Sequence, residues 1–102
     1  MKKETVTCPF GNKIVKGNAD DIQSRLMVHF QEELPRTIIF DMQHVSVCDS
    51  YGLRILLSFR RKAIAMKKTL LIYRPHNTLR QTLEMTNLIH MFTVSDNLPV
   101  ES

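Results

Sequence analysis

The sequence predicts an α/β fold in which a mixed β-sheet carries helices mainly on one face, in the order β-β-α-β-α-β-α-β. Two observations lead to this prediction. A β-branched and aromatic run at residues 37–40 and an apolar run at residues 70–73 are typical of strands buried on both faces. Stretches with apolar residues at helical spacing separate and follow them. Strands that alternate with helices imply parallel neighbours joined by right-handed crossovers. No repeat or linker-like run divides the 102 residues, so we expect residues 1–102 to form one domain.

The first half of the chain is expected to begin with two short strands. Residues 5–8 and 13–15 favour β-structure, and Gly11-Asn12 between them is a turn signal, so we expect an antiparallel hairpin. The first helix is then expected to begin at Asp20 or Asp21, because aspartate suits a helix N-terminus, and to end before Pro35.

The second half repeats the strand-then-helix pattern. After the strand at residues 37–40 and a short apolar piece at residues 45–48, Asp49 and Ser50 are typical capping residues for a long helix that reaches Lys68. After the strand at residues 70–73, a third helix would be capped by Asn77 or Thr78. Residues 89–94 are expected to supply a final short strand.

Composition indicates a protein that is neither exported nor inserted in a membrane. The apolar runs are too short to span a bilayer, and polar residues follow the basic start where a signal peptide needs an apolar segment. We therefore expect a cytoplasmic protein whose Cys8 and Cys48 are reduced, largely buried thiols. The four histidines have no ligand spacing, so we expect no metal and no other cofactor.

Positive charge is concentrated in the second half of the chain. The formal net charge is +4, and six basic residues lie within the expected second helix and its end: Arg54, Arg60, Arg61, Lys62, Lys67 and Lys68. Such a cluster could bind nucleic acid, with an affinity that falls steeply as salt is added. Because no aromatic residues are interleaved with it, the solvated face of a helix is the favoured interpretation.

The sequence gives no sign of catalysis. Neither a glycine-rich phosphate loop with Lys-Ser/Thr nor a G-x-S-x-G elbow is present. Asp41 ends a buried strand, as the phosphate-accepting residue of a receiver domain does, but no earlier strand ends in the acidic pair that magnesium would need. We therefore expect a binding protein and not an enzyme.

A set of motifs gives the chain a family resemblance. An apolar strand ends in Asp41, Val45 and Val47 follow, and then come Asp49-Ser50-x-Gly52-Leu53 at the start of a helix. Leu83-Glu84-Met85-Thr86-Asn87-Leu88 is similar to an L-x-x-[ST]-G-L stretch, and Gly17-x-x-Asp20 to a G-x-[LI]-D turn. In this order the set resembles the STAS domain, the family of bacterial anti-sigma factor antagonists and of the cytoplasmic tails of sulfate transporters.

The chain departs from that family pattern at several positions. Tyr51 stands where the family usually has a small residue, and Arg54 where it often has glycine. Met66-Lys67-Lys68 replaces the glycine that commonly ends the long helix, and Asn87 replaces the glycine of the last motif. Asparagine is the next-best residue for a left-handed backbone, so the last change is physically mild.

The resemblance implies that a partner kinase phosphorylates Ser50. A serine at a helix start is open to a kinase, and a phosphate there meets the positive end of the helix dipole, so it would alter docking more than folding. Plain helix capping is the alternative for Ser50 and Asp49. Asp20 matches a family residue that contacts the kinase, or it only complements the helix dipole. Gly52 allows either the approach of another chain or close packing of helix against strand.

The function that the resemblance implies is partner switching by an anti-sigma factor antagonist. The unmodified chain, a free monomer, would bind an anti-sigma factor that is also a serine kinase with a histidine-kinase-like ATP site. A PP2C-type phosphatase would reset the switch. The expected binding face comprises Asp20, Asp49, Ser50, Tyr51 and Gly52, with Arg54 at its rim. The alternative is a non-switching STAS module, an accessory subunit in a stress-signalling scaffold or in lipid transport.

Overall fold

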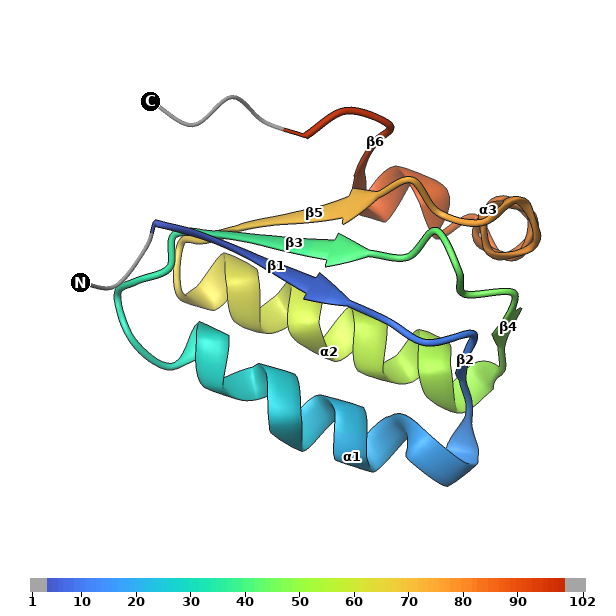
Figure 1. The fold of residues 1–102 in the computed structure, drawn as a ribbon, viewed down its shortest axis with the longest axis horizontal. Coiled ribbons are helices and arrows are strands. Elements are labelled where there is room, and N and C mark those ends of the chain that lie inside the picture. Colours follow the sequence, from blue (N-terminus) through green and yellow to red (C-terminus); the bar gives the residue numbers. More distant parts are fainter. Residues whose placement is uncertain (1–3, 99–102) are drawn as a thin grey trace.

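Two parallel sheets and three helices make up the fold (Figure 1), which a computed structural model describes for residues 4–98. The main sheet has the strand order β1-β3-β5-β6, and β2 pairs with β4 in a small second sheet. Helices α1 and α2 cover one face of the main sheet, while α3 lies beyond the ends of its strands. In chain order the elements are β1 (Thr5–Pro9), β2 (Lys13–Ile14), α1 (Lys16–Met27), the 3₁₀ turn Val28–Phe30, β3 (Thr37–Asp41), β4 (Val47–Cys48), α2 (Ser50–Ala65), β5 (Thr69–Tyr73), α3 (Asn77–Met85), the 3₁₀ turn Ile89–Met91 and β6 (Thr93–Ser95).

The α/β class and the helices on one face of the sheet are confirmed, but the antiparallel hairpin is wrong. Strand β1 pairs with β3 and β2 pairs with β4, both in parallel. Beyond β1 the chain stays beside β3, where the Phe10 N–H donates to the Asp41 carbonyl at 3.2 Å. The Asn12 carbonyl then accepts from the N–H groups of Ser46 and Val47. Gly11-Asn12 therefore leads the chain out of the main sheet and into β2, instead of folding it back on β1.

The core lies between the main sheet and helices α1 and α2. Alternate residues of β3 and β5 point toward the helices, and Ile38, Phe40 and Ile72 are fully buried there. The Phe40 ring packs edge-on against the Phe59 ring of α2, with the centroids 5.1 Å apart. Burial of such apolar faces is the main force that holds helices on a sheet.

Helix α1 begins at Lys16, four or five residues before the predicted start at Asp20 or Asp21. The Asn18 side chain accepts a hydrogen bond from the Val15 N–H at 2.8 Å, and Asp49 Oδ2 accepts from the Lys16 N–H at 3.0 Å. Free N–H groups at the start of a helix need such partners. Since one of them is supplied from 33 residues away, the local sequence does not reveal it.

Both α2 and α3 end in a Schellman motif without glycine. The Lys68 N–H donates to the Ala63 carbonyl at 2.8 Å, and the Leu88 N–H donates to the Leu83 carbonyl at 2.8 Å. This motif needs a left-handed residue after the helix, and Lys67 (φ 56°) and Asn87 (φ 59°) provide it. The left-handed backbone expected at Asn87 is confirmed.

The last elements differ in detail from the prediction. Helix α3 is capped by His76, whose Nδ1 accepts from the Thr78 N–H at 3.1 Å, and not by Asn77 or Thr78. The segment predicted as one strand over residues 89–94 divides into a 3₁₀ turn, Ile89–Met91, and strand β6. None of the helices within residues 4–98 is long and apolar enough to cross a membrane.

Candidate functional site

The carboxylate of Asp49 joins the N-termini of α1 and α2. Asp49 is the N-cap of α2, where its Oδ1 accepts from the Gly52 N–H at 3.0 Å, while its Oδ2 accepts from the Lys16 N–H. The hydrogen bond from Gly52, reinforced by the one from Lys16, lowers the pKa of the Asp49 carboxyl below its usual value. Asp49 thus holds two helix starts together at one point.

Gly52 allows the start of α2 to lie directly against strand β2. A Cβ atom at position 52 would meet the Ile14 carbonyl oxygen at 2.2 Å and the Cys48 Sγ at 2.8 Å. Gly52 is buried, and the atoms that press on it belong to this chain. Of the two explanations for this glycine, the structure shows close packing of helix against strand.

Ser50 is the first residue of α2, and its side chain is exposed. The next residue, Tyr51, is also exposed, and two cations lie over its ring. Lys16 Nζ is 5.5 Å from the ring centroid, and the Arg54 guanidinium carbon is 5.3 Å from it. Both distances fall in the range of cation–π contacts. Tyr51 and Arg54, two of the departures from the family pattern, therefore contact each other beside Ser50.

A groove of about 390 Å³ lies between α1 and α2, beside these residues. Asp20, Tyr51 and Arg54 line it together with Lys16 and Arg61. Asp20 is exposed, and because α1 begins at Lys16, it lies beyond the first helical turn. Its distance from the helix start argues against a helix-dipole role for Asp20. Its place in the groove favours a role in binding a partner.

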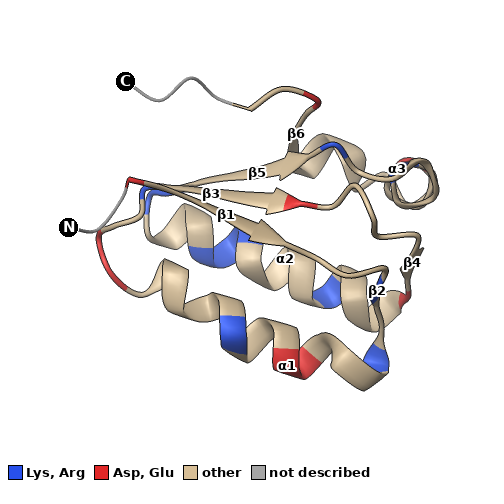
Figure 2. Cartoon of the chain, in the orientation of Figure 1, with Lys and Arg blue, Asp and Glu red and all other residues tan. Residues whose placement is uncertain are grey.

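The basic residues of α2 do not form one patch. Figure 2 shows them at intervals along α2, with acidic residues on the neighbouring α1. Arg54 and Arg61 face the groove between the helices, whereas Arg60 and Lys68 line a different hollow, near β5 and the Ile89–Met91 turn. Lys68 Nζ donates to the Glu33 carbonyl at 3.1 Å, so this side chain already has a structural partner. This division favours the solvated helix face over a nucleic-acid surface.

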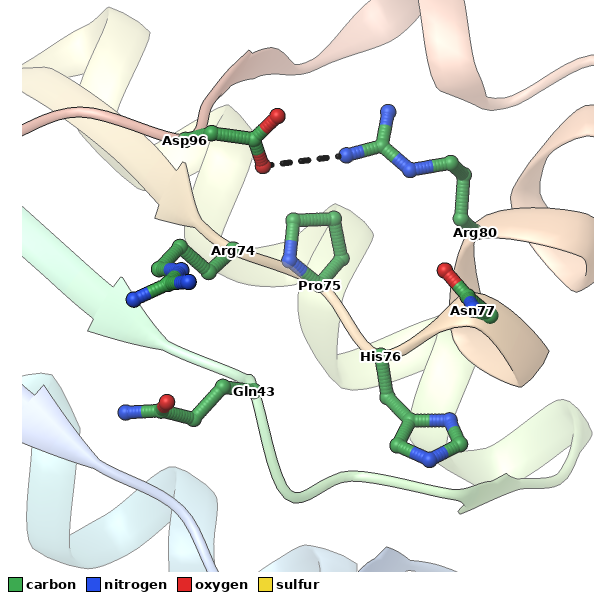
Figure 3. Close-up of a pocket in the computed structure, with 7 residues that line it drawn as sticks. All are labelled: Gln43, Arg74, Pro75, His76, Asn77, Arg80 and Asp96. Carbon is green, nitrogen blue, oxygen red and sulfur yellow. Dashed lines mark hydrogen bonds and ion pairs between the residues drawn. The ribbon is translucent and has the colours of Figure 1, made fainter.

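A second hollow, of about 580 Å³, lies at the C-terminal ends of β3 and β5 and contains none of the predicted site residues (Figure 3). Its arginines do not converge on one point: Arg74 points toward Gln43, while Arg80 points away and pairs with Asp96 at 3.4 Å. Nearby, Asp41 is hydrogen-bonded by Gln43. Within residues 4–98 no three His, Cys, Asp or Glu side chains are grouped as a metal site would require.

The structure thus brings together Asp20, Tyr51 and Arg54 in one groove. Asp49 and Ser50 do not line it, but they directly precede Tyr51 at the end of the groove where the two helices begin. Lys16 is the residue of this site that the sequence did not reveal. It is 35 positions from Tyr51 and belongs to no motif, so only the junction of the two helix starts identifies it.

Similar solved structures share this fold. The anti-sigma factor antagonist SpoIIAA in its unphosphorylated form matches at 18% identity, with a TM-score of 0.72 over 96% of this chain and 84% of that one. The phosphorylated form of SpoIIAA from Bacillus matches at 19% identity, with a TM-score of 0.70 over 92% of this chain and 85% of that one. A Thermotoga maritima protein, TM1081, described as a candidate anti-sigma factor antagonist, matches at 18% identity, with a TM-score of 0.81 over 93% of this chain and 81% of that one.

At these identities the similarity establishes the fold. A search of functionally curated proteins gives no match. The family itself is established by sequence, because the STAS domain model matches residues 2–99. The chain belongs to the STAS domain family.

Proposed function

We propose that this chain is a cytoplasmic anti-sigma factor antagonist that is switched by phosphorylation of Ser50. Its partner would be an anti-sigma factor with serine kinase activity and a histidine-kinase-like ATP site. The observation that carries the proposal is the exposed Ser50 side chain at the start of α2, at the end of the groove lined by Asp20, Tyr51 and Arg54. The chain would act as a single binding domain, a monomer without catalysis of its own.

In this proposal the partner enzymes carry out both chemical steps. The kinase would transfer the terminal phosphoryl group of ATP to Ser50 Oγ, forming a phosphate ester and releasing ADP and the hydroxyl proton. A PP2C-type phosphatase would hydrolyse the ester with water, which restores serine and gives inorganic phosphate. This chain supplies an accessible hydroxyl at a fixed helix end.

Phosphorylation at Ser50 is expected to change binding and not the fold. Ser50 is exposed, so a phosphate there needs no buried space. The positive end of the α2 dipole also stabilises a negative charge at this position. The modification adds nearly two negative charges to the end of the groove, which alters the charge that a docked partner meets.

Mass spectrometry of the protein from its native host, followed by calorimetry, tests the proposal. We expect one phosphate on Ser50 and binding of the unmodified chain to one of the host's anti-sigma factor kinases. Ser50→Asp should weaken that binding several-fold or more, with a melting temperature close to that of the wild type. Ser24→Asp is the matched control, because Ser24 is an exposed serine on α1, and it should bind like the wild type.

Unchanged binding of Ser50→Asp would refute the switch. If Ser50→Ala also left regulation intact and only lowered stability, Ser50 would be a helix-start residue in a non-switching STAS module.

A further inference from the structure

We propose that Arg54 and Lys16 bind the phosphate of phosphorylated Ser50 within the same chain, and that they leave the Tyr51 ring and the groove when they do so. This inference rests on the proposed phosphorylation of Ser50. It assigns a regulatory role to the two cations that lie on Tyr51, and it explains how a modification at the groove's end disables the groove itself.

In the unmodified chain the two cations make weak contacts with the Tyr51 ring. Each lies over a face of the exposed Tyr51 ring, and among residues 4–98 neither forms an ion pair with a carboxylate. A cation–π contact at an exposed site is weak. A charge-assisted hydrogen bond to phosphate is considerably stronger, and a guanidinium makes two of them at once. The phosphate therefore competes well for both side chains.

Both cations start close to Ser50. Arg54 is four residues after Ser50 on α2, and residues at this spacing are neighbours on a helix surface. Lys16 begins α1, and its N–H is bonded to the carboxylate of Asp49, the residue before Ser50. The junction of the two helix starts thus brings both residues near the modification site.

Two acidic groups act against this binding. Asp49 adjoins Ser50, and Asp20 lines the same groove. The Asp49 carboxylate is fixed by two backbone N–H groups, so it is not free to pair with Lys16 or Arg54 in place of the phosphate. A phosphate dianion, with three acceptor oxygens, is the stronger attraction for the two cations.

Binding in cis would remove two of the groove's three basic side chains, which leaves Arg61. A groove with these cations and an aromatic ring fits a partner segment rich in aspartate and glutamate. When Lys16 and Arg54 turn to the phosphate, such a segment loses its counter-charges and meets a new negative group. The partner of the groove is therefore an acidic segment, and the phosphate releases it.

The test uses full-length protein with phosphoserine installed at position 50 by genetic-code expansion, so that no kinase is needed. Phosphorus-31 NMR gives the second pKa of the phosphate, which is about 6 when the group has no partner. We expect this pKa to be lower by about 0.5 units or more in the wild-type background, because nearby cations favour the dianion. Arg54→Ala should abolish most of the shift and Lys16→Ala part of it. Arg61→Ala is the matched control, in the same groove but 11 residues from Ser50, and it should keep the full shift.

The tyrosine rings provide a second readout. The chain has two tyrosines and no tryptophan, and Tyr73 lies on β5, so it serves as an internal reference. On phosphorylation the Tyr51 ring resonances should move toward those of the unmodified Arg54→Ala variant, while the Tyr73 resonances stay in place.

A phosphate pKa that is the same in the wild type and in Arg54→Ala would overturn the inference, as would Tyr51 resonances that do not respond. Either result would leave the proposed kinase switch intact, because that proposal is judged by the phosphate found in host protein and by partner binding. Conversely, an Arg54-dependent pKa in a chain that the host never phosphorylates would support the binding in cis and refute the switch.

Discussion

Alanine at position 52 tests the junction on which the site is built. The added Cβ would lie 2.2 Å from the Ile14 carbonyl oxygen, whereas ordinary van der Waals contact begins near 3.4 Å. The obstacle is backbone, so a side-chain rotation cannot relieve the clash. Helix α2 must move about 1 Å away from β2. That movement strains the hydrogen bond from the Asp49 N–H to the same Ile14 carbonyl.

The expected loss of stability follows from two opposing effects. Overpacking a well-filled site typically costs about 1–3 kcal/mol, and a backbone clash belongs at the upper end of that range. Alanine is a better helix former than glycine by about 1 kcal/mol. The net cost is therefore about 2 kcal/mol, which in a domain of this size lowers the melting temperature by about 8–16 °C.

Urea and thermal unfolding measure this cost, and Gly17→Ala is the matched control. Gly17 also lies in the first turn of a helix, but a Cβ there has no atom within 4 Å. The control should therefore gain up to about 1 kcal/mol from helix propensity. If Gly52→Ala were as stable as the wild type, the close approach of α2 to Ile14 would be refuted.

Three further predictions concern helix ends and titration. Lys67→Gly should stabilise the chain by about 1 kcal/mol in urea unfolding and Asn87→Gly by less, because lysine tolerates a left-handed backbone less well than asparagine; equal effects would contradict this. The pKa of Asp49 is lower in the folded chain than in the unfolded chain, so its contribution to stability is present above pH 4 and is lost as pH falls through the pKa of the folded state. Asp49→Asn should therefore make stability fall less steeply at acid pH. Burial raises the pKa of Cys8 and Cys48 to about 11, so their contribution to stability is present below pH 9 and lost as pH rises toward 11. Cys48 is half-buried, and Cys48→Ala should make that alkaline loss less steep. An unchanged slope would argue against a raised pKa of the Cys48 thiol.

Sequence alone predicts where the strands and helices of this fold lie along the chain better than it predicts which of them pair or pack together. The runs at residues 37–40 and 70–73 are strands because their apolar and β-branched residues suit burial on both faces. The prediction of a hairpin was wrong because Gly11-Asn12 specifies a change of direction but not the strand with which the chain then pairs. Likewise, α1 begins early because Asp49 supplies a hydrogen bond that no local pattern encodes.

In the candidate site, too, local features could be predicted from the sequence and contacts between distant segments could not. Ser50 and Asp49 were predicted as helix-start residues, and they are, since capping chemistry is local. Asp20 and Arg54 were placed on one face only by resemblance to a family, and the structure lines one groove with both. Lys16 could not be predicted, because its place on the Tyr51 ring depends on how two distant helices meet.

Parallel pairing also has a consequence for the time course of folding. Among the strands described in the main sheet, a helix and its loops separate each bonded pair along the chain: α1 lies between β1 and β3, α2 between β3 and β5, and α3 between β5 and β6. Closing such long connections costs entropy before any ladder forms, and chains with these distant contacts fold more slowly than helical bundles. Strand β3 can pair with β1 only after the connection that contains α1 has closed, and with β5 only after the connection that contains α2 has closed. Until these connections close, the strand edges stay unpaired, and unpaired edges expose the chain to aggregation.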